Sequence, residues 1–147
     1  MNDRQTINGC EIWTDADFAE MGWHDAVLYS MSFPQANCTI GFDIDYIFEW
    51  HWQDDAVRGW DVAPCTLEFH DVTNLKLSLD WQTLGDTSIQ DINRQNSRLS
   101  PNGKFILWDY QIELDVGAIQ FTATGFTQTV RRPPVFSDSQ QLAQRGE

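Results

Sequence analysis

The chain has 147 residues, a formal net charge of −13 and 41% hydrophobic residues. This length fits a single domain, residues 1–147, that buries about two-thirds of its unfolded surface and needs no disulfide or metal to fold. So acidic a chain is not expected to bind nucleic acid or an anionic membrane surface. It has no run of about 18 apolar residues, so no transmembrane helix is expected.

The acidic residues are concentrated in the first half of the chain. Residues 1–72 hold 14 acidic and 2 basic residues, a net charge of −12, whereas residues 73–147 hold 8 acidic and 7 basic residues, a net charge of −1. Such an acidic half would steer a basic partner toward itself at low salt. Solubility alone is the other explanation of the same charge.

The cysteines and the first residues predict a location. Cys10, Cys38 and Cys65 are odd in number and lack the spacing of a metal site, so we expect reduced thiols. The chain starts without a basic segment followed by an apolar one, so no secretory signal is expected there. Together these features predict a cytoplasmic protein.

The first predicted elements are a helix and a strand. Residues 1–10 are polar and expected to be frayed. Thr14 followed three residues later by Asp17 is typical of a helix capping box, and Gly22 would end that helix. A strand is expected at about residues 26–33, ended by Pro34.

Residues 38–52 carry the clearest pattern in the chain. Every even position is apolar: Cys38, Ile40, Phe42, Ile44, Tyr46, Phe48, Trp50 and Trp52. This alternation predicts a central strand with one face in the core, Cys38 included. The other face would carry three carboxylates and an imidazole. With the strand before it, this strand would form an antiparallel hairpin.

The second half of the chain predicts further hairpins. Residues 53–65 are rich in Asp and contain Gly and Pro, so we expect a long loop. Residues 66–81 predict a second hairpin around residues 72–74. A strand is expected at 86–94 and a loop at 95–104. Residues 105–130 predict a third hairpin that turns at Val116 and Gly117.

The last part of the chain predicts a weakly docked tail or helix, residues 135–147. The two prolines in residues 131–134 cannot donate hydrogen bonds and would end the sheet. Ser137 and Gln140 are spaced as in a capping box. In total, about seven hairpin-linked strands predict a mainly β (α+β) fold with a short helix near each end. The sheet would be a curled antiparallel sheet or a two-sheet sandwich.

The polar face of the central strand is the first candidate site, with Asp43, Asp45, Glu49 and His51. A solvated face that blocks edge pairing and an acidic partner-binding face are two explanations. A third is a metal site. Residues two apart on a strand project side by side, so Glu49 and His51 could bind one ion with a further carboxylate from a neighbouring strand.

The other histidines and the tryptophans suggest alternatives. His24 and His70 each precede an Asp, but adjacent residues of a strand point to opposite faces, so the dipeptides do not predict catalytic dyads. Convergence of the histidines would give a metal site of Glu49, His51, His24 and His70. Trp52 and Trp60 are candidate interface hot spots, with burial as the alternative for both.

Catalytic signatures are missing from the sequence. It has no G-x-S-x-G motif, no cysteine with an activating motif and no glycine-rich phosphate loop. These observations favour a binding protein over an enzyme, and no cofactor is expected.

Four segments carry a resemblance to a known group of proteins: MGWHDAVLYSMSF, DIDYIFEWHW, APCTLEFHDVTNLKL and GAIQFTATGFTQTVRRP. They resemble small β-rich bacterial immunity proteins of contact-dependent and polymorphic toxin systems. Some of those carry a Trp-x-Trp motif like Trp50-His51-Trp52. The resemblance implies a protein that binds and neutralises a partner.

We therefore expect a protein-binding module, of immunity type, that inhibits a basic partner. The residues expected to contact it are Asp43, Asp45, Glu49, His51, Trp52, Asp54, Asp55, Trp60 and Asp61. The alternative is a small metal-dependent enzyme or a ligand-binding β-barrel.

Overall fold

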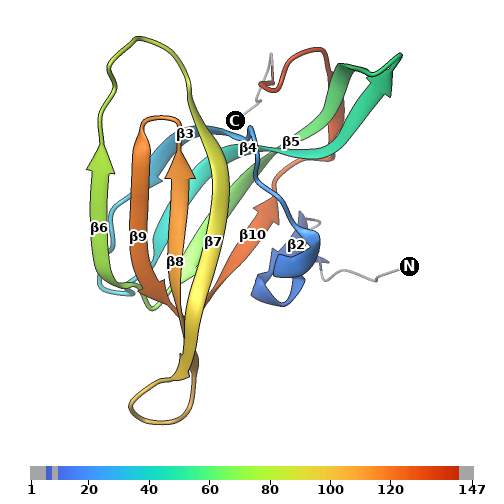
Figure 1. Ribbon diagram of the computed structural model, residues 1–147. Coiled ribbons are helices and arrows are strands. Elements are labelled where there is room, and N and C mark those ends of the chain that lie inside the picture. Colours follow the sequence, from blue (N-terminus) through green and yellow to red (C-terminus); the bar gives the residue numbers. More distant parts are fainter. Residues whose placement is uncertain (1–5, 8–9, 143–147) are drawn as a thin grey trace.

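A computed structural model describes residues 6–7 and 10–142 (Figure 1). Within these residues the chain forms eleven strands and one short 3-10 helix. In chain order the elements are β1 Thr6–Ile7, β2 Cys10–Thr14, η1 Asp15–Glu20, β3 Val27–Ser32, β4 Ile40–Gln53, β5 Ala56–His70, β6 Thr73–Leu79, β7 Thr87–Leu99, β8 Ile106–Leu114, β9 Gly117–Ala123, β10 Gly125–Val130 and β11 Val135–Ser137. The predicted mainly β class is confirmed.

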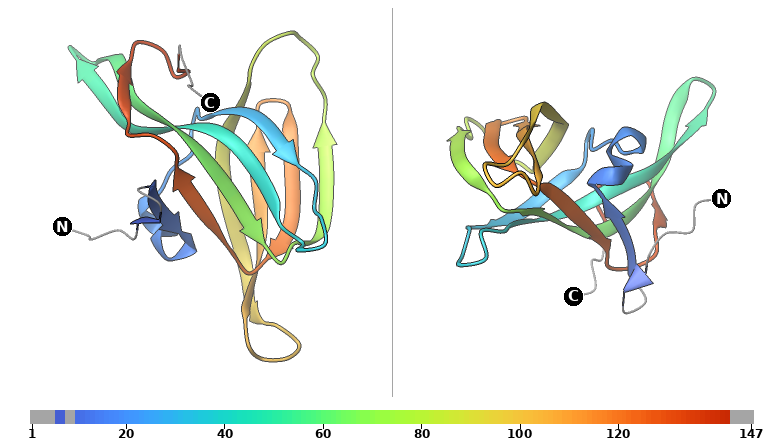
Figure 2. Two further views of the ribbon diagram at one scale, coloured as in Figure 1. Left: turned by 180° about the vertical axis from the view of Figure 1, so that it is seen from behind. Right: turned by 90° about the horizontal axis from the view of Figure 1, so that it is seen from below.

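The strands form one open antiparallel sheet, in the order β1-β2-β10-β5-β4-β3-β7-β8-β9-β6, with β11 beside β5. The sheet bends sharply where β3 meets β7, because these strands pair only through Val27 with Ser88 and Leu28 with Thr87. Its two halves therefore face each other as two layers (Figure 2). The curled sheet and the sandwich, predicted as alternatives, are combined in one structure.

Aromatic side chains fill the space between the two layers. Phe69 of β5 lies 5.0 Å from Tyr110 of β8 and 4.7 Å from Phe121 of β9, measured between ring centroids. The even residues of β4 from Ile40 to Tyr46 are buried beside them, as the alternating pattern predicts. Burial of such rings is the largest single source of stability in a core of this kind.

The predicted N-terminal helix is present as η1. Thr14 is its N-cap and accepts a hydrogen bond from the backbone N–H of Ala16, while the Asp17 carboxylate accepts one from the N–H of Thr14 at 3.0 Å. The capping box was therefore a correct prediction, although the helix is of the 3-10 type. Residues 1–5 and 8–9, within the segment expected to be frayed, lie outside the described residues.

The predicted loop at residues 53–65 is wrong, because β4 and β5 form one long hairpin. Gln53 pairs with Ala56, so only Asp54 and Asp55 form the turn, with φ values of 53° and 62°. Two consecutive residues of positive φ are typical of the type I′ turn, and Asp tolerates this backbone better than most residues do. The Asp-rich sequence encodes a tight turn between two long strands.

The predicted hairpin at residues 66–81 is also wrong. β6 pairs with β9 at one edge of the sheet, whereas β5 lies between β4 and β10 in the other layer. Asp71 and Asn74 have φ values of 55° and 56° and redirect the chain between the layers. The third predicted hairpin is confirmed as β8 and β9. Its second strand ends before Thr124, however, and β10 then crosses to the layer that contains β5.

The remaining corrections concern strand ends. The strand predicted at 86–94 is confirmed but continues to Leu99, so the connection to β8 is only residues 100–105. The predicted helix at Ser137 and Gln140 is wrong within the described residues. β11 pairs there with β5, so the sheet also continues after the prolines. Cys38 is exposed, because it precedes β4 with a positive φ of 57°.

Candidate functional site

A β-bulge in β4 divides the face that the sequence predicted as continuous. Ile47 pairs with Val62, but Glu49 pairs with the next residue of β5, Asp61. Directly paired residues share a face, and consecutive residues of β5 point to opposite faces. Glu49 therefore lies on the face opposite to Ile47, because Phe48 is the extra residue of the bulge.

The two aspartates before the bulge are bound to neighbouring groups, and Asp45 is also buried. Asp43 forms an ion pair with Arg131, with 2.7 Å between Oδ1 and Nη2. Asp45 is fully buried and accepts hydrogen bonds from the Tyr29 hydroxyl and from the backbone N–H of Leu142. Asp45 is therefore not part of an exposed acidic surface.

Because of the bulge, Trp60 pairs with Trp50 and lies on the same face of the sheet. Trp50 and Trp60 are paired across β4 and β5, with ring centroids 5.8 Å apart. Both pack against a buried cluster of Ile47, Val62 and Leu142. Trp60 is partly buried as a result, so burial, the alternative explanation for this residue, fits the structure.

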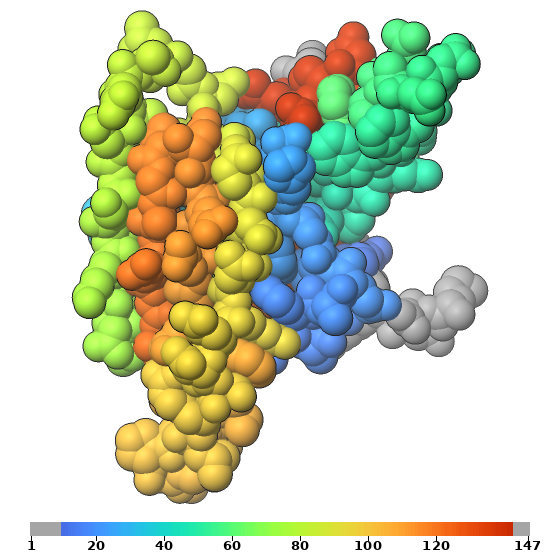
Figure 3. All heavy atoms as spheres, in the orientation of Figure 1, coloured from blue at the N-terminus to red at the C-terminus, as the bar shows by residue number. Residues whose placement is uncertain are grey.

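Residues 48–61, named here the distal arm, project from the body of the sheet (Figure 3). The arm consists of the last part of β4, the Asp54-Asp55 turn and the first part of β5. Trp52 is 66% exposed, and Glu49, Asp54 and Asp55 are exposed beside it. Most residues predicted to contact a partner thus lie on this arm, apart from Asp43 and Asp45.

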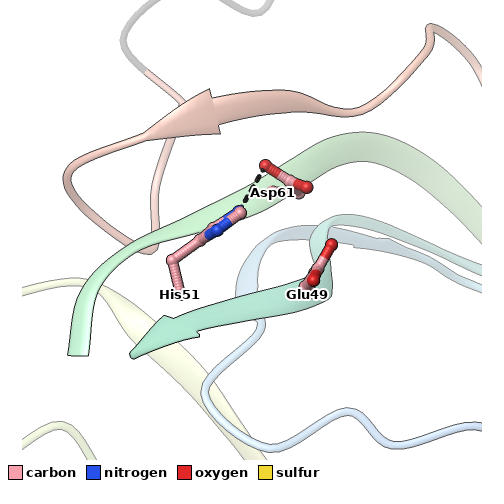
Figure 4. A group of neighbouring side chains, drawn as sticks. All are labelled: Glu49, His51 and Asp61. Carbon is pink, nitrogen blue, oxygen red and sulfur yellow. Dashed lines mark hydrogen bonds and ion pairs between the residues drawn. The ribbon is translucent and has the colours of Figure 1, made fainter. Parts of the chain in front are cut away.

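Three polar side chains of the arm converge on one face (Figure 4). His51 Nε2 lies 2.8 Å from Asp61 Oδ1, with the two side chains 38% and 30% exposed. The Glu49 carboxylate lies next to them, and one donor atom from each residue falls within 4.8 Å of the other two. Asp61 is thus the further carboxylate from a neighbouring strand that a metal site at Glu49 and His51 requires.

Phe136 of β11 holds the His51 ring from one side. The two ring centroids are 5.4 Å apart with the rings tilted by 67°. Phe136 lies across Gly59, where a Cβ atom would come within 2.3 Å of the Phe136 ring. A glycine is needed at this position so that β11 can pack here, and the packing restricts the orientation of His51.

The three histidines do not converge. His24 stacks on the Trp50 ring, which lies on the face opposite to His51, and its Nδ1 is 3.1 Å from the Gln90 carbonyl oxygen. His70 Nε2 is 2.9 Å from the Thr127 hydroxyl, next to the start of β4. The predicted four-residue metal site is therefore wrong, and only Glu49 and His51 of that set lie together.

In the other layer, neighbouring side chains shift the pKa of one carboxylate, Asp109. Hydrogen bonds from Arg98, Asn96 and Thr122 hold the pKa of Asp109 below the usual value for aspartate. In the same layer, burial raises the pKa of the Tyr110 hydroxyl, and the nearby Arg94 opposes this effect. The Asp109 carboxylate is satisfied within the fold, and neither group extends the candidate site.

Comparison of the chain with protein-family models, curated proteins and solved structures found no match. Among the described residues, no helix has the length and apolar character needed to cross a membrane. The function must therefore be argued from the geometry of the distal arm.

Proposed function

We propose that this chain is a protein-binding module that docks on a basic protein through the tip of its distal arm. The observation that carries the proposal is the exposure of Trp52, 66%, on a projecting hairpin next to two turn aspartates. A tryptophan held on a hairpin offers a large contact area at a small cost in conformational entropy, and tryptophan is enriched in binding hot spots.

The charge of the arm supports a basic partner. Residues 48–61 contain four carboxylates and a single arginine, Arg58. Among the described residues, none of these carboxylates is paired with an arginine or lysine of the chain. Carboxylates without a local cation steer a basic surface and gain from neutralisation on binding. An immunity-type inhibitor, which the sequence resembles, is a protein of this kind.

The test uses a variant that removes the contact and keeps the fold. Trp52→Ala combined with Asp54→Asn and Asp55→Asn deletes the ring and two charges, and Asn tolerates the positive φ of the turn. The chain offers a matched control in another loop, where Trp81 is 53% exposed between Asp80 and Asp86. Trp81→Ala with Asp80→Asn and Asp86→Asn makes the same chemical change there.

We expect wild type and the control variant to retain one basic protein from a lysate of the source cells. After purification, that protein should bind the arm variant at least tenfold more weakly by calorimetry. Its affinity for wild type should fall between 50 and 300 mM salt, because exposed charges are screened. Recovery of no such protein, or equal affinity for wild type and the arm variant, would contradict the proposal.

A further inference from the structure

We propose that Glu49, His51 and Asp61 form a binding site for one divalent first-row metal ion, of the kind represented by Zn²⁺ and Mn²⁺. The inference uses residues at the base of the arm, whereas the proposed contact uses Trp52 and the turn, so different variants test the two proposals.

The donor atoms lie close to ligand spacing and need only small shifts to reach it. Two ligands of one ion at metal distances of about 2.1 Å lie roughly 3.0 to 3.4 Å apart. His51 Nε2 and Asp61 Oδ1 are separated by 2.8 Å, and all three donors lie within 4.8 Å of one another. Glu49 is exposed, so its carboxylate can rotate toward the ion without disturbing packed neighbours.

The backbone fixes this arrangement. The bulge in β4 places Glu49 opposite Asp61 and brings both to the face that carries His51. Phe136 packs against the imidazole across Gly59. A ligand whose orientation is restricted before binding loses less entropy when the ion arrives.

The donor set selects the class of ion. One imidazole and two carboxylates suit Zn²⁺, Mn²⁺ and Fe²⁺, whereas Ca²⁺ requires six to eight oxygen ligands. Two carboxylates and a neutral imidazole give a local charge of −2, which matches the charge of the ion. Three protein ligands leave at least one coordination position for water or for a group of another molecule.

The chain contains a built-in control. His24 lies 3.5 Å from the Asp25 carboxylate, yet the two belong to no group of three converging donors among the described residues. His24→Ala thus removes a histidine beside a carboxylate without touching the proposed site. Because exposed Cys38 could bind Zn²⁺ by itself, all variants should carry Cys38→Ser.

The experiment is calorimetric titration of tag-free, metal-stripped protein with Zn²⁺ and with Mn²⁺. We expect one ion per chain. Affinity should be unchanged in His24→Ala and reduced at least tenfold in both His51→Ala and Asp61→Asn, with circular dichroism confirming the fold. In a nuclear magnetic resonance spectrum, Mn²⁺ should broaden the amide signals of residues 49–51 and 59–61 first.

Two results would overturn the inference. One is the absence of saturable binding below 1 mM of either ion. The other is binding that His51→Ala and Asp61→Asn leave unchanged, which would place the ion elsewhere. In both cases the 2.8 Å contact is only a hydrogen bond within the chain. The partner experiment measures the effect of substitutions at Trp52 and the turn, which the metal experiment leaves intact. Either proposal can therefore fail without the other.

Discussion

The β4–β5 and β7–β8 hairpins are built alike but satisfy their charges differently. Each is a long antiparallel pair with two shifts in register, and the two project from opposite ends of the sheet (Figures 1 and 3). Near the end of β7–β8, the carboxylate of Asp109 accepts hydrogen bonds from Arg98, Asn96 and Thr122. In the distal arm, the Asp61 carboxylate is close to an imidazole and to no arginine or lysine among the described residues.

The comparison shows that a nearby arginine decides whether a carboxylate in a hairpin stabilises the fold or stays open to a ligand. In β7–β8 the arginine is encoded within the same hairpin, so the charge stabilises the fold and is not offered to a ligand. In the distal arm, Arg58 is paired with none of the carboxylates among the described residues. A compensating cation can come from solvent, from a metal ion or from a basic partner.

The largest effect is expected where the β4–β5 hairpin enters the core. Asp45→Ala removes the carboxylate that accepts hydrogen bonds from the partly buried Tyr29 hydroxyl and from the buried Leu142 N–H. Such losses cost about 1–3 kcal/mol for each buried group, so we expect about 2–4 kcal/mol in urea unfolding. Asp86→Ala, at an exposed position, is the control. A loss below about 0.5 kcal/mol for Asp45→Ala would show that this end of the hairpin does not depend on the carboxylate.

A smaller effect is expected in the distal arm itself. Gly59→Ala forces the Phe136 ring away from β5, with an expected cost of about 1–3 kcal/mol. Phe136→Ala in the same chain should remove part of the extra cost, since the added methyl group then meets only the Ser137 carbonyl oxygen, at 2.9 Å. Urea unfolding of the two single variants and the double variant measures this coupling. Strictly additive changes would show that Phe136 does not lie across Gly59.

The acid dependence of stability tests the β7–β8 side. The pKa of Asp109 is lowered in the folded chain, so its contribution is present above the unfolded pKa, about 3.9, and is lost as pH falls through the folded pKa. Asp109→Asn should therefore flatten the decline in stability between pH 5 and pH 2. The side chain is 36% exposed, so solvent screening limits the effect to less than about 1 kcal/mol. An unchanged acid limb would contradict the assignment.

The smallest effect is expected for a conservative change at the turn of β4–β5. Asp54→Asn with Asp55→Asn should change stability by less than about 0.5 kcal/mol, since both residues keep a favourable turn type. Replacing both by Val should cost more than 1 kcal/mol, because β-branched residues strongly disfavour positive φ. Equal stability of the two variants in thermal melts would show that the type I′ turn is not required.

The sequence predicted the local structure well where the signal was local. Period-two alternation located β3, β4, β8 and β9, and the Thr14-Asp17 spacing located η1. The sequence-based prediction failed where one extra residue changes which face of the strand the following side chains occupy. The bulge at Phe48 reverses the faces of β4, so Glu49 and His51 no longer share a face with Asp43.

The sequence indicates two of the three residues of the candidate metal site. It identifies Glu49 and His51 as possible ligands, but its Asp-rich segment predicts a long loop, which includes Asp61. Trp60 and Val62, two positions apart with Asp61 between them, were the local signal that could have extended β5. Pairing of Phe136 with Asp61 joins residues 75 positions apart, and no local pattern encodes such a contact.

Thr124 separates β9 from β10, so the last strand of the layer containing β5 to be synthesised before β11 is β10. β2, near the beginning, pairs with β10, which ends at Val130. During synthesis the edge of β5 that receives β10 therefore stays open until β10 itself has left the ribosome. An open strand edge is a template for association with other chains. We therefore expect fragments that stop before Gly125 to aggregate, and the full chain to fold late and slowly, as sheets with distant pairings do.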